Sequence, residues 1–128
     1  MKTNTKKTSS PNDKRFVQSD SLAENIKTIQ SYSSLEEDED FVPVAQREIQ
    51  RAVSALEAIY KTAKLLPFFI VPTRSGGVGL EYKVKDTKAN YRFDPDGLMY
   101  FAVMKDVTVL KRAMLTNPAE APALIEAI

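Results

Sequence analysis

The residues best suited to chemistry lie in two short stretches rich in glycine and aspartate. The stretch 76–79, Gly-Gly-Val-Gly, has the glycines of a phosphate-binding loop, and Asp94 and Asp96 stand beside Gly97 as in a calcium-binding loop. A phosphate-binding loop leads into a helix, whereas a strand pattern follows these glycines. A calcium loop closes with glutamate at its twelfth position, which here is Lys105. Both stretches are therefore predicted to be hairpin turns.

The composition removes several classes of catalytic site. The 128 residues include no cysteine, histidine or tryptophan. A cysteine nucleophile, a serine–histidine–aspartate triad, a disulfide scaffold and a zinc site with the usual ligands are therefore excluded. Carboxylates, lysine, arginine, tyrosine, serine and threonine are left for catalysis, and we predict no metal and no cofactor.

Acid–base catalysis would need a pair of carboxylates in environments that shift their pKa values. The candidates in the second half of the chain are Glu81, Asp86, Asp94, Asp96 and Asp106. The strand pattern puts Glu81 on the polar side of its strand, and the aspartates fall in predicted turns. Since the sequence places none of them in an apolar pocket, we predict that the protein is not an enzyme.

A long amphipathic helix over 42–66 precedes these residues. Apolar side chains recur at threes and fours from Ala45 to Leu66, and charged and amide side chains occupy the opposite side. Pro43 suits the first turn of a helix, and Pro67 ends it.

After Pro67 the apolar period changes from helical spacing to two, which predicts strands over 68–73, 80–85, 90–94 and 98–104. Asp106 is predicted to cap a helix over 107–115, because Val107, Leu110 and Met114 recur at helical spacing. Residues 117–120, Asn-Pro-Ala-Glu, have the form of a capping box before another short helix. The predicted fold class is α+β: a long amphipathic helix packed on a four-stranded antiparallel meander, with short C-terminal helices.

The first 41 residues differ in composition from the rest. They have few apolar side chains, with basic residues near the start and an acidic block over 36–40. Such a segment buries too little apolar surface to offset its ordering entropy. Residues 1–41 are therefore predicted to form a disordered charged N-terminal arm, and residues 42–128 a single domain. A short helix over 21–32 is an alternative for part of this arm, because Leu22, Ile26 and Ile29 share helical spacing.

The sequence predicts a cytoplasmic protein that does not enter a membrane. The polar start contains no signal-peptide pattern, and the longest apolar run, 65–72, is far shorter than the ~20 residues that span a bilayer. The formal net charge of +1 is also unlike the strongly basic charge of a dedicated nucleic-acid binder.

A basic side of the predicted sheet is nevertheless the best candidate for nucleic-acid contact. Its residues are Arg74, Lys83, Lys85, Lys88 and Arg92. A basic surface with aromatic side chains suits single-stranded nucleic acid, but strand alternation turns Tyr91 and Phe93 to the other side, where they are predicted to be core residues.

The strand over 98–104 is apolar on both sides, which implies a second covering layer. Met99, Phe101 and Val103 are the side chains predicted to bind a partner or a second copy of the chain. The alternative is that the chain's own C-terminal helices cover them.

Residues 67–104 resemble a hairpin module found in small uncharacterised bacterial proteins, with the pattern P-T-x-x-G-G-V/I-x-L-E-W/Y. The matching stretches here are 71–73, 76–78, 80–82 and the Asp-Gly turn at 96–97, with Tyr82 where tryptophan is frequent. Such proteins often look like one member of a two-gene cassette of toxin–antitoxin type. The resemblance implies a protein partner rather than catalysis, and it supplies no site residues.

Together these patterns predict a non-enzymatic cytoplasmic bacterial protein-interaction module, antitoxin-like or a small regulatory subunit, whose charged arm folds on binding. One alternative is a nucleic-acid-associated accessory protein that uses the basic side of the sheet. Another is a small-ligand binder in the cleft between helix and sheet.

Overall fold

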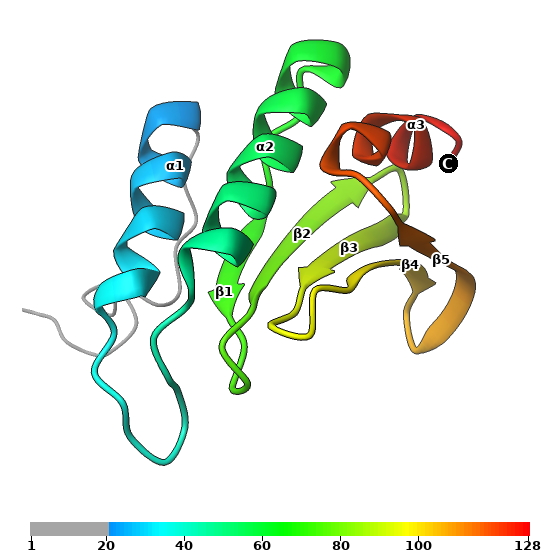
Figure 1. Cartoon of the computed structure of the whole chain (residues 1–128). Helices are drawn as coiled ribbons and strands as arrows, with labels where there is room; N and C mark the ends of the chain where they lie inside the picture. Colours follow the sequence, from blue (N-terminus) through cyan, green and yellow to red (C-terminus); the bar gives the residue numbers. More distant parts are fainter. Residues whose placement is uncertain (1–20) are drawn as a thin grey trace, which may run out of the picture.

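The computed structural model describes residues 21–128, which form one layer of helices on one antiparallel sheet (Figure 1). The helices are α1 (Leu22–Ser31), α2 (Gln46–Ala63) and α3 (Ala121–Glu126). Two short 3-10 turns, η3 (Tyr32–Ser34) and η4 (Pro118–Glu120), follow α1 and precede α3. The predicted α+β class is confirmed.

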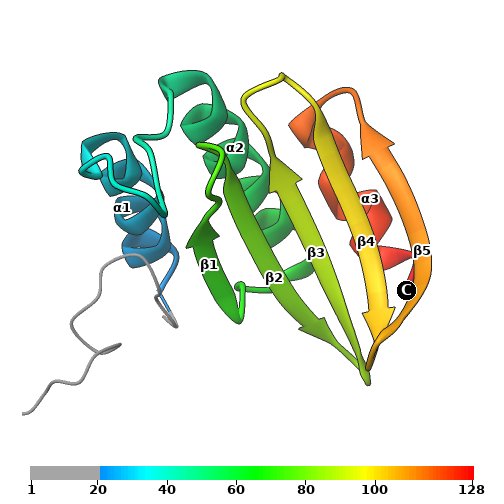
Figure 2. The ribbon, with the colours of Figure 1, turned by 90° about the horizontal axis from the view of Figure 1, so that it is seen from below.

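The sheet is a meander of five strands rather than the predicted four. Its strands are β1 (Phe69–Pro72), β2 (Val78–Val84), β3 (Thr87–Phe93), β4 (Met99–Lys105) and β5 (Thr108–Leu115). Each strand pairs only with its neighbours in sequence, so β1 and β5 are the two edges. Figure 2 looks onto the face of the sheet that carries no helix, with the helices behind it. We call this the outer face, and the face under the helices the inner face.

Helix α2 confirms the long helix expected from the apolar spacing. Its buried side includes Ile49, Ala52, Leu56 and Ile59. The helix ends at Lys64, whose φ of 59° is left-handed and whose backbone N–H closes the last turn on the carbonyl of Tyr60.

The two glycine-containing turns are hairpin turns, as predicted. Gly76 (φ 95°) lies between β1 and β2, and Gly97 (φ 88°) lies between β3 and β4. At Gly77 a Cβ atom would lie 2.4 Å from the carbonyl oxygen of Phe93, so a side chain at this position would collide with the backbone. The glycines of the 76–79 stretch therefore serve the turn and the close approach of neighbouring strands.

The helix predicted over 107–115 is wrong, because these residues form the turn before β5 and β5 itself. Lys105 pairs with Thr108, so Asp106 and Val107 make a two-residue turn in which Asp106 has a positive φ of 55° rather than capping a helix. The pairing shifts between Val103 and Met104, which leaves an extra residue in β5. The bulge interrupts the period of two in β5, and Val107 lies in the turn, so its helical spacing to Leu110 and Met114 does not reflect a helix.

The prediction that the folded domain begins at residue 42 is also wrong. Helix α1 packs beside α2, and Ile29 and Tyr32 are fully buried. The Tyr32 hydroxyl donates to the carbonyl of Ile70 in β1, and the Tyr32 carbonyl accepts from the N–H of Val44. The alternative of a helix over 21–32 is therefore the correct one, while residues 1–20 of the predicted arm lie outside the described residues.

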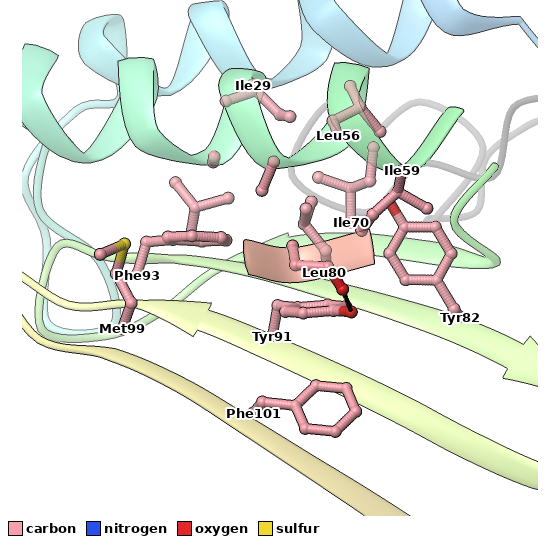
Figure 3. Close-up of a cluster of buried hydrophobic side chains, with 14 of the residues drawn as sticks. Ile29, Leu56, Ile59, Ile70, Leu80, Tyr82, Tyr91, Phe93, Met99 and Phe101 are labelled. Atoms are coloured by element: carbon pink, nitrogen blue, oxygen red, sulfur yellow. Dashed lines mark hydrogen bonds between the residues drawn. The ribbon is translucent and has the colours of Figure 1, made fainter. Parts of the chain in front are cut away.

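The core fills the space between the helices and the inner face (Figure 3). Leu56 and Ile59 of α2 face Leu80, Tyr82 and the other inward side chains of the strands. The rings of Tyr82 and Tyr91 meet edge to face with centroids 5.8 Å apart, a favourable geometry for aromatic pairs.

Two buried tyrosines differ in how their hydroxyls are satisfied. The Tyr91 hydroxyl donates to the carbonyl of Ala121 at 2.6 Å and so joins β3 to the start of α3. The Tyr82 hydroxyl has no partner among the described residues, and neither has the side-chain amide of Asn25 in α1. Burial raises the pKa of both phenols above the ordinary value near 10.

The place of α1 in the core predicts a loss of stability on Ile29→Ala. Removing a fully buried isoleucine side chain should lower the free energy of unfolding by about 2–4 kcal/mol. Lys27→Ala, at an exposed position of the same helix, should change it by less than about 0.5 kcal/mol. Chemical denaturation measures both values, and equal effects would contradict the packing of α1.

The two tyrosines predict opposite results for the same substitution. Tyr91→Phe should lower the free energy of unfolding by about 1–2 kcal/mol, because the buried carbonyl of Ala121 loses its donor. Tyr82→Phe should leave it unchanged or raise it by up to about 1 kcal/mol, because it removes a buried hydroxyl without a partner.

Alkaline pH provides an independent readout of Tyr82. Burial raises the pKa of Tyr82 in the folded state, so Tyr82 ionises at a lower pH in the unfolded chain than in the folded protein. Ionisation of this phenol therefore costs no stability below pH ~10, and the folded state loses stability as the pH rises above that value. The free energy of unfolding of the wild type should therefore fall above pH 10 more steeply than that of Tyr82→Phe, by up to ~1.4 kcal/mol per pH unit. Equal slopes would contradict the burial of this phenol.

Candidate interaction surface

The outer face of the sheet has no helix over it among the described elements (Figure 2). Strand alternation and the pairing register place one set of side chains there: Phe69, Val71, Gly79, Glu81, Lys83, Lys88, Asn90, Arg92, Tyr100, Ala102, Met104, Val109, Arg112 and Met114. All of them are half-buried or exposed, because no helix covers them. The face mixes apolar, aromatic and basic groups, so it differs from the dry inner face.

The five basic residues predicted for nucleic-acid contact do not all share this face. Lys83, Lys88 and Arg92 lie on it. Arg74 is in the turn between β1 and β2, where it pairs with Asp40 at 3.2 Å. Lys85 is in the turn between β2 and β3, and its ammonium donates to the carbonyl of Ile128 at 3.0 Å.

Carboxylates and an aromatic ring contact the basic side chains of the outer face. Lys88 lies 3.4 Å from Glu81, and Arg92 lies 3.0 Å from Asp94. The guanidinium of Arg92 also stacks 4.4 Å from the ring centre of Tyr100. These contacts reduce the positive potential that a free basic patch would present to a polyanion.

The ammonium of Lys83 lies 3.8 Å from the ring centre of Phe68, a close cation–π contact. One basic hollow remains at the end of the sheet where the β2–β3 and β4–β5 turns meet. It measures about 290 Å³ and is lined by Lys83, Lys85 and Lys88 together with Asp86 and Asp106. The structure therefore brings together three of the five predicted basic residues.

The prediction that Met99, Phe101 and Val103 form a partner surface is corrected. All three point to the inner face and are buried in the core. The sequence establishes which residues of the strand share a side, but the position of the helices decides which side is covered. The side of β4 without a covering helix carries Tyr100, Ala102 and Met104.

Exposed apolar side chains gather on a different feature, the hairpin of β4 and β5. Across residues 21–128, every large hydrophobic side chain that is strongly exposed lies on this hairpin or just before it: Leu98, Val107, Val109, Leu110 and Met114. Their exposed fractions run from 38% to 92%. Sequence reasoning missed this surface because it assigned 107–115 to a helix whose apolar residues would have been covered.

An apolar hollow adjoins the inner side of β5 below α3. It measures about 180 Å³, and its walls include Val103, Leu110 and Lys111 from the sheet and Leu124 and Ile128 from the C-terminal segment. We call it the α3 hollow. Its volume is below the roughly 300–1,000 Å³ of sites that hold small molecules.

The five candidate carboxylates are dispersed, and four of them already have partners. Glu81 and Asp94 are in the ion pairs described above, and Asp96 accepts from the N–H of Leu98. Lys105 hydrogen-bonds Asp86 and lowers its pKa. Asp106 is in the turn before β5. Over the described part of the chain, no three acidic side chains come together in a group that could hold a metal.

A buried ionic cluster at the start of α2 had no signal in the sequence. Glu48 is only 1% exposed, and its carboxylate accepts from Arg47 at 2.6 Å and lies 3.7 Å from Arg51. The same arginines donate to the carbonyls of Pro95 and Gly97 in the β3–β4 turn. Glu48 thus orients two side chains that fasten α2 to this turn.

Comparisons of the chain with protein-family models, curated proteins and solved structures found no match. Between residues 21 and 128, no helix is long and apolar enough to cross a membrane.

The cluster around Glu48 predicts a loss of stability on Glu48→Ala. The substitution removes a buried acceptor and releases both arginines from their orientation toward the turn, so the free energy of unfolding should fall by about 1–3 kcal/mol. Glu57→Ala, at an exposed position of the same helix, should change it by less than about 0.5 kcal/mol. Urea denaturation compares the two, and equal values would contradict the proposed fastening.

Proposed function

We propose that the chain is a non-enzymatic protein-interaction module whose contact surface is the β4–β5 hairpin with the adjoining outer face. One observation carries this proposal: in residues 21–128, the strongly exposed large apolar side chains all belong to this hairpin or immediately precede it. Exposed apolar side chains that occur singly are ordinary, whereas a concentration on one feature is typical of an interface.

Burial of these apolar side chains by a partner would supply part of the free energy of binding. Complete burial of a leucine, valine or methionine side chain contributes about 1.5–3 kcal/mol. Burial of two such residues by a partner therefore offsets a substantial part of the cost of association. Basic and aromatic groups of the outer face, such as Arg92 and Tyr100, would form the polar rim that specific interfaces have.

The biological role of this interaction module is proposed from the sequence. The hairpin resemblance over residues 67–104 favours an antitoxin-like protein or a small regulatory subunit, which would act in the cytoplasm of a bacterium on a protein partner. The lack of cysteine and histidine supports binding over catalysis, since it removes the commonest nucleophile and base.

A nucleic-acid-associated accessory protein is the second candidate. The basic hollow lined by Lys83, Lys85 and Lys88 favours it. The ion pairs on the outer face and the formal net charge of +1 weigh against it. Salt-dependent retention of the wild type on DNA, lost in the variant Lys83→Glu with Lys85→Glu, would support this candidate, and retention that does not change with salt would remove it.

A small-ligand binder in the cleft between helix and sheet has the least support. Core side chains such as Leu56, Leu80 and Tyr91 occupy the space between α2 and the inner face. The α3 hollow lies at another place and is small for such a ligand.

The interaction proposal predicts that hairpin variants lose a specific partner. Tagged wild-type protein, purified from its native host, should retain one protein in stoichiometric amount by mass spectrometry and light scattering. Leu110→Ser with Met114→Ser should reduce the retained amount at least about tenfold, because two exposed apolar side chains are lost from the contact.

The matched control is Gln50→Ser with Glu57→Ser, at two exposed positions of α2, the helix that covers the inner face. Both double variants should unfold within about 1 kcal/mol of the wild type, since exposed positions tolerate substitution. Recovery of wild-type protein alone as a monomer would contradict the proposal, as would a partner that the hairpin variant retains fully.

A further inference from the structure

The two edges of the sheet are protected to very different degrees. Edge strand β1 has four residues and contains Pro72, which has no N–H to offer a further strand. Its Ile70 carbonyl accepts the hydroxyl hydrogen of Tyr32, and α1 packs beside it. Short length, proline and a capped carbonyl are typical means of closing a sheet edge.

Edge strand β5 is open by the same criteria. It has eight residues and no proline, and within the described chain no strand pairs with its outer edge (Figure 2). Most of its side chains are exposed, since only Leu115 is buried and Ala113 is half-buried. Every second residue of an edge strand directs its N–H and C=O away from the sheet, where another strand can pair with them.

The bulge limits the part of β5 that can accept a strand. It lies where the β4 pairing shifts between Val103 and Met104, next to Leu110. From Lys111 to Leu115 the pairing with β4 is regular. An added strand would therefore align with this run of five residues.

The α3 hollow lies beside this run. Leu110 and Lys111 of β5 line it from the sheet, and Leu124 and Ile128 line it from the C-terminal segment. Alternate side chains of a strand added to β5 would point to the same side of the sheet as the hollow. Backbone hydrogen bonds then supply affinity and the hollow selects an apolar side chain, as in known strand-addition complexes.

The charge of β5 selects the kind of strand. Lys111 and Arg112 are exposed, no acidic residue lies in the strand, and none of the described acidic side chains pairs with either. Lys111 pairs with Val103 and lies on the inner side beside the α3 hollow, whereas Arg112 pairs with Ala102 and lies on the outer face. A strand with glutamate or aspartate opposite Arg112 on the outer face is favoured by cross-strand pairing. A second copy of β5 paired about either residue would bring Lys111 against Lys111 or Arg112 against Arg112, which is unfavourable.

From these observations we infer that β5 accepts an extended segment of a partner protein, in which acidic residues alternate with apolar ones, as a sixth strand. An apolar side chain of this segment occupies the α3 hollow on the inner side of the sheet, and its acidic side chains lie on the outer face and pair with Arg112. The inference rests on the proposed function and specifies the mode of binding and the chemistry of the partner.

The test uses the full chain and a synthetic peptide of about ten residues in which glutamate alternates with valine or leucine, capped at both ends. Fluorescence anisotropy measures its binding, and amide hydrogen exchange by NMR reports the strand. The peptide should bind, and the amides of β5 over 111–115 should exchange at least about tenfold more slowly in its presence. A peptide with a central proline should bind at least about tenfold more weakly, because it cannot complete the backbone pairing.

Reversing the charge on β5 tests whether this strand selects an acidic partner segment. Arg112→Glu should weaken binding of the glutamate peptide about tenfold, and this variant should bind a peptide with lysine in place of glutamate. Lys27→Glu makes the same change of charge at an exposed position of α1, beside the opposite edge of the sheet, and should leave the affinity within about twofold.

The outcomes separate this inference from the proposed function. Strand addition is overturned if the peptide binds without slowing amide exchange in β5, or if its affinity does not change when the charge on β5 is reversed. If the peptide does not bind, strand addition is overturned. If the variant Leu110→Ser with Met114→Ser nevertheless loses the partner captured by the wild type, the proposed function is retained. Concentration-dependent self-association that β5 substitutions abolish would assign the edge to a second copy and overturn the inference.

Discussion

The burial of one side of the meander beneath α2 is the constraint on which the rest of the structure depends. Leu56 and Ile59 are buried against the inward apolar side chains of the central strands. With α1 and α3 beside α2, the inner face is covered and the outer face stays open. Because the described helices all lie on one side, the outer face, the strand edges and the turns are the surfaces left for contact with other molecules.

Local patterns predicted most of the elements. Helix α2 has many apolar positions at one spacing, and Gly76 and Gly97 mark turns whose positive φ glycine adopts without strain. Strand β5 was not predictable in this way, because its bulge breaks the alternation and its exposed edge carries charged side chains. Composition did not reveal helix α1, because most of its side chains are polar and its contact with the core depends on a few residues such as Ile29, with Tyr32 following in η3.

The candidate surface was predictable only in part, since it depends on tertiary structure. Alternation correctly put Lys83, Lys88 and Arg92 on one side of the sheet, but the ion pairs that engage two of them come from register and turns. For β4, alternation separated two sets of residues without deciding which set the helices cover. Glu48 gave no signal, because its burial depends on a turn more than forty residues further along the chain.

The meander has a consequence for the order in which the chain folds. All strand pairs join neighbours in sequence, so the sheet can assemble by successive hairpins with short loops to close. The hydrogen bond from Tyr32 to Ile70 spans 38 positions and joins α1 to the sheet only when β1 is in place. During synthesis α1 and α2 leave the ribosome before the strands that cover them. Their apolar sides therefore stay open to water, or to a chaperone, until the first hairpins have formed.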